Sequence, residues 1–557
     1  MPQENLTPLL LASSSMPQST AAASYGATDD HDASTPKNAH DGGLQRGLSS
    51  RQVSMIAIAG TIGTGLFLGT GKSLAQGGPA SMLICYAIVG FIVYITLLLL
   101  GEMSTQYPVA ASFNAFTSRF VSPSYSFALA YNYWLNDAIS LASDLTAAQL
   151  VLQFWTPLHT WIISLVFWVF LVGVNSIHVR SYGELEYWLS LLKVATIIVF
   201  IILGILVNVG VNKEHRYIGG HYFREAPFVG GFGGFANVFV TASFAYGGTE
   251  SLAITAGETR NPTRNIPRVV RFVFWRIMIF YILSILLIGL NVPHDYPDLS
   301  NRSTTTSPFT IVFKEAGSTV AASFMNTVIL TSVLSAGNHA LFAGTRVLYG
   351  LSVASPRQAP TIFSKTTSRG VPIPALLATS SISLLCFGSS FIGSGQLWGW
   401  LQNLVGVSNQ IAWLSIGLAS YRFRQAWIRQ GRSLEDLKFH TSWTRIWGPP
   451  FVIVSVTGLI LVQGWSSIFP HFSATDFISY YIEIPLMVLM FIVWAYIVRP
   501  LTRGNTQQQT GLQWVFDLVD TRTVDLETDV YEDNEADKAD DTQNQQTWWR
   551  RLFFWIA

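Results

Sequence analysis

The chain has 557 residues, of which 50% are hydrophobic and only 12% are charged, whereas soluble domains have about 25% charged residues. This balance, with 18 Trp and 36 Phe, predicts a polytopic membrane protein. A net charge of +1 argues against nucleic acid or another polyanion as a partner. The two cysteines, Cys85 and Cys386, lie in apolar runs and imply neither a disulfide framework nor a metal cluster.

Residues 1–50 are rich in small and polar residues without periodicity and are expected to form a disordered tail. Long apolar runs follow, each of a length that can cross a bilayer. The runs lie at about 53–75, 79–101, 127–151, 160–177, 187–210, 231–256, 272–292, 318–353, 373–393, 395–421, 449–469 and 477–499. We therefore predict an all-α protein with twelve transmembrane helices over residues 51–500, followed by a cytosolic tail at 501–557 whose acidic part, 525–541, is solvated.

The first run is interrupted by glycine, in the sequence IAGTIGTGLF at 58–67. Glycine-rich stretches favour a broken helix, and a broken membrane helix needs protein, ligand or water to satisfy its freed backbone groups. A second interrupted stretch, FAYGGTE at 244–250, lies in the sixth run. Close helix packing through small residues is the alternative, but the pair favours a binding site at mid-membrane depth. Breaks five spans apart also indicate two inverted five-helix repeats, with two helices added.

Lysine and arginine gather in the loops at 257–271, 354–371 and 422–448. In a twelve-span protein these loops share one side with both termini, and positive loops face the cytosol. Both tails are therefore expected in the cytosol.

Ionisable residues within membrane spans are costly and are candidates for function. Asp137 and Asp144 are seven residues apart, so both lie on one face of the third span. They form either an acidic wall that holds a cation or a proton, or a pair of structural hydrogen-bond acceptors. Lys193 in the fifth span either takes the place of a coupling cation or extends to the interface. Glu102, at the end of span two, is either functional or an exposed helix-end acid.

At the second break, Tyr246 either covers a bound substrate or is an ordinary packed aromatic, and Glu250 follows directly. His339 is expected to be a satisfied interior histidine. The sequence contains no Walker loop, zinc-ligand spacing, nucleophile triad or dinucleotide fingerprint. We therefore expect neither an enzyme nor a pump driven by ATP, and no cofactor or metal.

These motifs together resemble the yeast amino acid transporter group of the amino acid–polyamine–organocation superfamily. The matching blocks are GTIGTGLF at 60–67, GEM at 101–103, YNYW at 131–134, GTE at 248–250, TAGETRNP at 255–262, SAGN at 335–338, RVLY at 346–349 and VPIP at 371–374. The resemblance implies a leucine-transporter-type inverted-repeat fold and proton-coupled amino acid uptake at the plasma membrane.

The resemblance also implies the site. Backbone N–H groups would hold the substrate carboxylate, carbonyls after the sixth-span helix would hold its amino group, and Tyr246 would be the aromatic lid. Lys193 matches a lysine that replaces sodium in proton-coupled relatives, and Glu250 joins it as a proton-coupling candidate. The substrate-binding residues implied are Thr61, Ile62, Gly63, Thr64, Gly65, Asp144, Ala245, Tyr246, Gly247 and Gly248.

Three positions depart from the family pattern: Asp144 replaces the usual Glu, Gly247 replaces the usual Gln, and the chain ends at Ala557 without the usual cysteine. The region from Ser408 to Leu437 looks most like members that carry basic amino acids. We therefore expect lysine or arginine as substrate, with Asp144, and Asp137 as a second acid, facing its side-chain cation. A broad neutral permease and a non-transporting sensor of the same fold are the alternatives.

Overall fold

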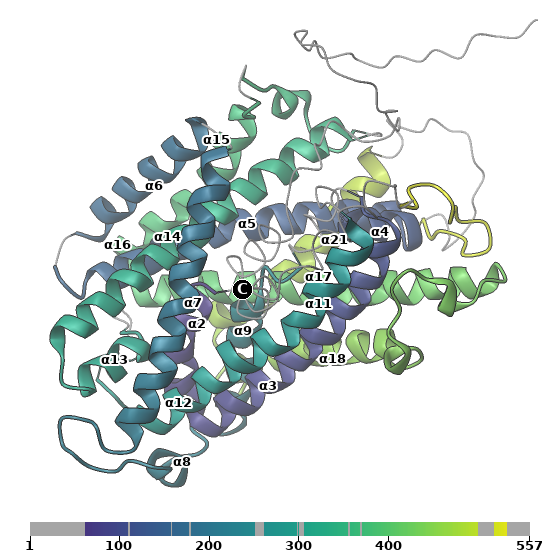
Figure 1. Cartoon of the computed structure of the whole chain (residues 1–557). Helices are drawn as coiled ribbons and strands as arrows, with labels where there is room; N and C mark the ends of the chain where they lie inside the picture. Colours follow the sequence, from purple (N-terminus) through teal and green to yellow (C-terminus); the bar gives the residue numbers. More distant parts are fainter. Residues whose placement is uncertain are drawn as a thin grey trace, which may run out of the picture. The chain divides into compact units, whose positions relative to one another are not determined.

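The computed structural model describes residues 62–109, 112–156, 159–177, 180–250, 261–297, 299, 306–354, 357–367, 370–498 and 517–531. The chain divides into two units, Met1–Leu44, which lies outside these residues, and Gln45–Ala557. Within the described part of the second unit every regular element is a helix, which agrees with the all-α prediction (Figure 1).

The helices occur in chain order with the following bounds. The α-helices are α2 (Thr64–Phe67), α3 (Gly69–Gln106), α4 (Ser112–Phe120), α5 (Pro123–Leu152), α6 (Thr160–Ile177), α7 (Arg180–Asn208), α8 (His221–Glu225), α9 (Gly231–Tyr246), α11 (Pro262–Arg276), α12 (Ser284–Asn291), α13 (Pro308–Glu315), α14 (Thr319–Val353), α15 (Ile373–Ile382), α16 (Ser389–Ile392), α17 (Ser394–Arg429), α18 (Gly448–Val462), α19 (Trp465–Ile468), α20 (Ala474–Tyr481) and α21 (Glu483–Val493). The π- and 3₁₀-helices are η2 (Ile277–Leu283), η3 (Thr361–Ser364), η4 (Ser383–Gly388), η5 (Leu434–Asp436), η6 (Ser442–Thr444) and η7 (Trp494–Val498).

Six of the described helical segments are long and apolar enough to cross a membrane, and a bent pair makes a seventh. The six are Gly69–Gln106, Trp188–Asn208, Pro262–Asn291, Thr319–Val353, Ile373–Ile392 and Gly448–Ile468, and the bent pair is Ala474–Tyr481 with Glu483–Ile497. Helices α5 and α17, with 30 and 36 residues, are also long enough to cross a membrane, but they bury many polar side chains. The count of twelve spans stays a prediction.

The first and second predicted spans meet inside one long helix. Within α3, Gly78 has φ of 82°, a left-handed conformation that separates the helix into two parts, and Pro79 begins the second part. A side chain at Gly78 would also meet the Pro227 carbonyl oxygen at 2.8 Å. The kink therefore requires glycine and falls between the two apolar runs that the sequence separates.

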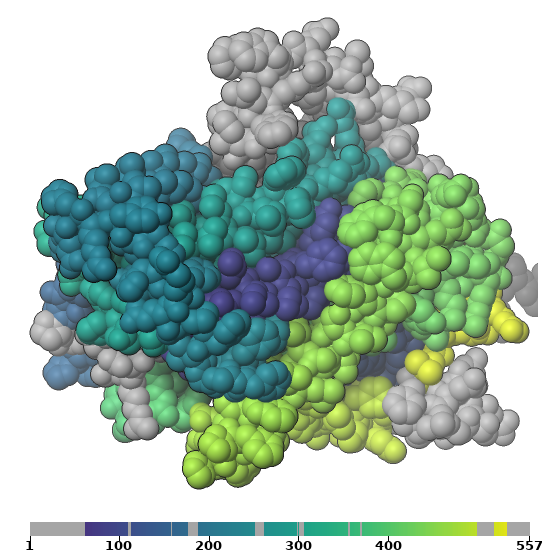
Figure 2. All heavy atoms as spheres, turned by 90° about the horizontal axis from the view of Figure 1, so that it is seen from below, coloured from purple at the N-terminus to yellow at the C-terminus, as the bar shows by residue number. Residues whose placement is uncertain are grey.

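The centre of the fold is built by α5, which packs against α14 on one side and α17 on another. Helix α3 packs along α9 and also contacts α11, α12 and α18. Figure 2 shows part of α3 in purple between teal helices and the light-green helices of the last third of the chain. The two helices that carry the broken stretches, α2 and α9, are thereby held inside the bundle.

An ion pair joins the ends of α3 and α17. The Arg424 guanidinium donates two hydrogen bonds of 2.8 Å to the Glu102 carboxylate, and the His440 ring Nδ1 lies 3.0 Å from Glu102 Oε2. Both Glu102 and Arg424 are buried, so the alternative of an exposed helix-end acid is wrong. A bidentate pair fits because the planar guanidinium matches the carboxylate geometry.

The last described segment, residues 517–531, packs against the same end of the bundle, and we call it the C-terminal strap. Figure 1 draws the strap in yellow beside α4. Arg119 donates to the backbone oxygens of Asp525 and Thr528 at 3.0 and 2.8 Å, and Tyr107 donates to Leu526 O at 3.0 Å. The acidic stretch from 525 was expected to be solvated, and the side chains of Asp525, Glu527 and Asp529 are exposed. The strap is nevertheless docked, because Leu526 is buried to 1% exposure in the core.

A turn within the strap is stabilised by the Asp525 carboxylate. The Thr528 side chain, and the backbone N–H groups of Glu527 and Thr528 at 2.8 and 3.1 Å, donate hydrogen bonds that lower the pKa of the Asp525 carboxyl to about 2. Hydrogen bonds to the ionised form cause this shift, so the carboxylate holds the turn at any physiological pH.

Replacing Glu102 with Gln should destabilise the protein by about 3 kcal/mol, because the variant leaves the buried Arg424 charge unpaired. Thermal unfolding of the purified protein in detergent measures the change. Glu435→Gln is the matched control, since Glu435 pairs with Arg445 at 3.8 Å and is 78% exposed. Equal stability losses in the two variants would contradict a structural role for the Glu102 pair.

Replacing Leu526 with Asp should release the strap, because burial of a leucine contributes about 1.5–3 kcal/mol. We expect trypsin to cleave after Arg522 at least tenfold faster in the folded protein, as local opening becomes easier. Leu518→Asp is the control, since Leu518 lies in the strap and is 49% exposed. Equal cleavage rates in both variants would show that Leu526 does not hold the strap.

Candidate functional site

The first broken stretch lies against α14. Ile62 and Gly63 precede α2, and Gly63 is extended, with φ of −144° and ψ of −151°. The Ile62 carbonyl accepts a hydrogen bond from Ser332 Oγ at 3.3 Å, and a side chain at Gly63 would meet Ala336 Cβ at 3.3 Å. Thr61 lies outside the described residues. Ile62 and Gly63 are therefore non-helical directly before α2, and α14 supplies a partner for the Ile62 carbonyl; the part of the first run before Ile62 lies outside the described residues.

The two broken stretches touch. A Cβ added at Gly65 would lie 2.4 Å from Ala245 Cα, so the α2 backbone rests directly on the end of α9. Helix α9 ends at Tyr246, and Gly248 follows with φ of 80°. The two interruptions, which are far apart in sequence, thus form one region, as a shared binding site requires.

A polar amide fills the space beside the second break. A Cβ at Gly247 would lie 2.0 Å from Asn409 Nδ2 of α17. Asn409 Nδ2 donates to Ser243 O at 3.3 Å, and Asn136 of α5 donates to Asn409 Oδ1 at 3.2 Å. The glutamine absent at position 247 is thus replaced by an amide from another helix, which sequence reasoning did not identify.

Asp144 lies at the first break. Its side chain is 5% exposed, and its Oδ1 accepts a hydrogen bond from Thr64 Oγ1 at 2.8 Å. A Cβ at Gly337 of α14 would lie 3.3 Å from Asp144 Cβ, so a glycine makes room for the acid. The prediction that this acid faces the interior is confirmed, and the structure brings it to the unwound backbone.

Lys193 is buried, and the alternative that it extends to the interface is wrong. Its side chain is 1% exposed, and Nζ donates to Ser335 Oγ of α14 at 3.1 Å and lies 3.9 Å from Glu186 Oε1. Ser335 in turn donates to Glu186 Oε1 at 2.5 Å. Sequence reasoning missed Glu186, although it precedes Lys193 by seven residues and so shares its helix face.

At the second break, Tyr246 is packed among aromatic rings in this conformation. Its ring stacks on Tyr281 with centroids 4.4 Å apart, and its hydroxyl donates to the Tyr86 carbonyl at 3.2 Å. Tyr281 donates to Ala245 O at 2.7 Å, so that carbonyl already has a partner. The structure therefore contains the packed alternative for Tyr246, and a role as lid requires its ring to move.

Glu250 is fully buried and accepts several hydrogen bonds. Oε1 accepts from the Tyr133 hydroxyl and the Gly248 N–H, and Oε2 from Thr249 Oγ1 and Trp413 Nε1, all at 3.3 Å. Four donors around one carboxylate stabilise its ionised form. The structure thus joins α5, α9 and α17 at this residue.

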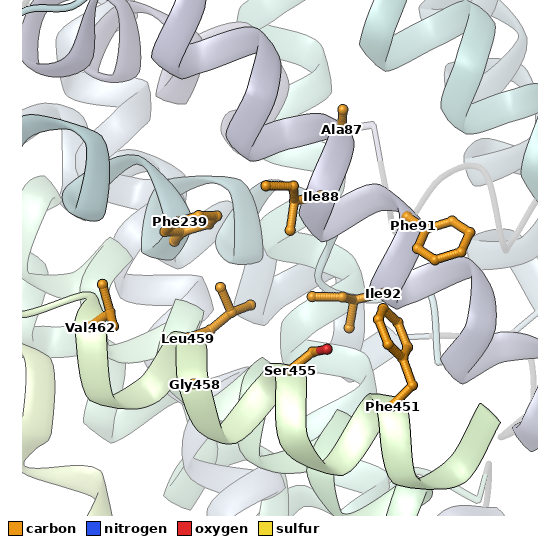
Figure 3. A pocket seen from close by; sticks show the side chains of 10 residues that line it. All are labelled: Ala87, Ile88, Phe91, Ile92, Phe239, Phe451, Ser455, Gly458, Leu459 and Val462. Atoms are coloured by element: carbon orange, nitrogen blue, oxygen red, sulfur yellow. The ribbon is translucent and has the colours of Figure 1, made fainter. Parts of the chain in front are cut away.

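One apolar groove lies apart from these residues. It has a volume of about 630 Å³ and runs between α3, α9 and α18 (Figure 3). Its lining residues are Ala87, Ile88, Phe91, Ile92, Phe239, Phe451, Ser455, Gly458, Leu459 and Val462. A single hydroxyl and no charge give this groove nothing to hold a zwitterion, so it is not the site of polar recognition.

The chain is similar to membrane transport proteins across most of its length. Residues 52–503 match the amino acid permease family. A probable amino-acid permease of Schizosaccharomyces pombe is 43% identical over 85% of this chain and 96% of its own length. The lysine-specific permease of Escherichia coli is 42% identical over 81% of this chain and 93% of its own.

The fold is similar to that of a solved transporter. A manganese transporter of Eremococcus coleocola has a TM-score of 0.50 at 14% identity and is matched over 80% of this chain and 93% of its own. The helical fold with its apolar spanning segments is that of a polytopic membrane protein. The chain belongs to the amino acid permease family, which confirms the resemblance found in its motifs.

Replacing Gly65 with Ala should abolish transport, because the new methyl group meets the Ala245 backbone at 2.4 Å and forces the two breaks apart. Uptake of a pooled set of labelled amino acids by permease-deficient yeast measures the effect, with surface expression quantified. Gly173→Ala in α6 is the control, since nothing lies within 4 Å of its added Cβ. Normal uptake by the Gly65 variant would contradict close contact between the breaks.

Proposed function

We propose that this protein is a plasma-membrane permease that couples the uptake of basic amino acids, lysine or arginine, to the entry of protons. The observation that carries the proposal is the buried carboxylate of Asp144 beside the unwound Ile62–Gly63 backbone. A zwitterion with a cationic side chain needs donors for its carboxylate and an acceptor for its side chain. The freed N–H groups at a broken helix and a buried acid are suited to these two tasks.

In this proposal the substrate lies between the two breaks. N–H groups of Thr61 to Gly65 bind its carboxylate, and carbonyls among Ala245 to Gly248 bind its amino group. Because Tyr281 already donates to Ala245 O, the carbonyls beyond position 245 are the better acceptors for the amino group. Tyr246 covers the substrate only after leaving its stack on Tyr281.

Asp144 selects the cationic side chain. Its single described donor, Thr64, leaves it able to accept a further hydrogen bond from an ammonium or guanidinium group. A charge-assisted bond to a buried carboxylate discriminates strongly against a neutral side chain, because such bonds are roughly twice as strong as neutral ones. The similarity to a lysine-specific permease supports this choice of substrate.

Lys193 acts as a resident cation in place of a metal ion. Lys193 and Glu186, both of α7, bond Ser335 of α14 and so tie the two helices together, and Lys193 interacts electrostatically with Asp144. Glu250, held by donors from α5, α17 and the turn after α9, is the second proton-coupling residue. Both tails face the cytosol, the side to which the positive loops are assigned.

Labelled lysine uptake into permease-deficient yeast tests the proposal, with Asp144→Asn as the central variant. The amide keeps the acceptor for Thr64 but loses the charge, so uptake of lysine and arginine should fall at least tenfold, whereas Asp144→Glu should retain it. Wild-type uptake should collapse with a protonophore.

Three results would contradict the proposal. Unchanged lysine uptake by the surface-expressed Asn variant would remove Asp144 from recognition. Wild-type uptake of neutral but not basic amino acids would make the protein a neutral permease. Saturable binding without flux of any amino acid would make it a sensor.

A further inference from the structure

The acids of α5 are matched by glycines of α14. A Cβ at Gly337 would lie 3.3 Å from Asp144 Cβ, and a Cβ at Gly344 would lie 2.9 Å from Asp137 Cβ. The two acids are seven residues apart, and so are the two glycines, so the glycine–acid contact occurs twice along the interface, two helical turns apart. At 1.5 Å per residue, Asp137 lies about 10 Å from Asp144 toward the beginning of α5. The interface is therefore built to bury two acids, of which only Asp144 is at the breaks.

Asp137 differs from Asp144 in its surroundings. Among the described residues its buried Oδ2 has no hydrogen-bond partner, and no described Lys, Arg or His forms an ion pair with it. From α15, Thr379 faces the same contact at Gly344, but its hydroxyl donates to Ala375 O and accepts from Trp134. An ionised carboxylate is costly in such a place, because one of its two oxygens, Oδ2, is buried without a donor.

The titratable groups that face Asp137 are Glu250 and Tyr133, both of which interact with it electrostatically. Glu250 has four donors, whereas Asp137 Oδ2 has none. Two acids that interact in one buried region do not both ionise readily, and the one with fewer donors keeps the proton. Of the two acids, Asp137 is therefore the one whose surroundings favour the protonated form more strongly.

We propose that Asp137 is a proton-carrying residue of the permease, separate from the substrate site. It lies on the cytosolic side of Asp144 in the orientation proposed above. A proton that enters with the substrate forms the Oδ2–H bond, and that bond breaks when the proton leaves to water on the cytosolic side. A Cβ added at Gly344 would lie 2.9 Å from Asp137 Cβ and 3.8 Å from Oδ2, so the α14 backbone packs against this acid and Oδ2 is enclosed without a donor. The inference rests on the proposed proton coupling.

Asp137→Asn is the decisive variant, because an amide has the shape of a protonated carboxyl but cannot release a proton. The full-length protein is reconstituted in lipid vesicles. Exchange of labelled for unlabelled lysine needs no net proton movement and should stay within about twofold of the wild type. Accumulation of lysine driven by an acid outside pH, and the proton influx that lysine induces, should fall at least tenfold.

Two further variants complete the test. Asp137→Glu should restore coupling, since it retains a carboxyl, and Glu435→Gln controls for loss of an exposed acid. If the Asn variant does not reach the vesicles folded, Asp137→Ser is measured in the same way, with the same expectation of exchange without coupling.

The outcomes separate this inference from the proposed function. Wild-type lysine transport without proton influx would overturn the proposed coupling itself. Coupling by the wild type and equally by the Asn variant would overturn only the role of Asp137. Loss of exchange together with coupling, in a folded variant, would assign Asp137 to substrate binding and overturn its role as a separate proton site.

Discussion

The structure depends on the direct contact between two interrupted helices, where Gly65 of α2 rests on Ala245 of α9. A helix broken inside a membrane leaves N–H and C=O groups that no lipid can satisfy. Contact between two such breaks places these groups in one protected region instead of exposing them separately. The cost of interrupting each helix is thus offset by a polar site that neither helix forms alone.

The helices around this region satisfy those freed groups. Ser332 of α14 donates to Ile62 O, Asn409 of α17 donates to Ser243 O, and Tyr281 donates to Ala245 O. The first two donors come from helices that pack on the breaks, α14 on α2 and α17 on α9, and Tyr281 comes from η2. Ser332 of α14 and Asn409 of α17 are therefore explained by the backbone carbonyls to which they donate.

The features that sequence predicts are those with a local signal. The glycines at 63, 65 and 247–248 indicate the two breaks, and the seven-residue spacing of Asp137 and Asp144 indicates a shared interior face. Partners far along the chain leave no such signal. Arg424 is 322 residues from Glu102, and Leu526 docks on Tyr107 from 419 residues away. The pairing of Glu102 and the docking of the strap therefore could not be predicted: the sequence left Glu102 open between a functional and an exposed acid, and the stretch from 525 was expected to be solvated.

Position 247 shows how an apparent loss of polarity is compensated. In the sequence, Gly247 stands where the resemblance implies Gln, so the second break lacks that side-chain amide. In the structure, Asn409 of α17 occupies the space in which a side chain at 247 would begin, and it donates to Ser243 O in the last turn of α9. A large side chain at 247 and the observed Asn409 conformation exclude each other, since their atoms would lie 2.0 Å apart. The amide beside the second break is therefore carried by the continuous helix α17, where Asn136 donates to its oxygen at 3.2 Å and fixes its orientation.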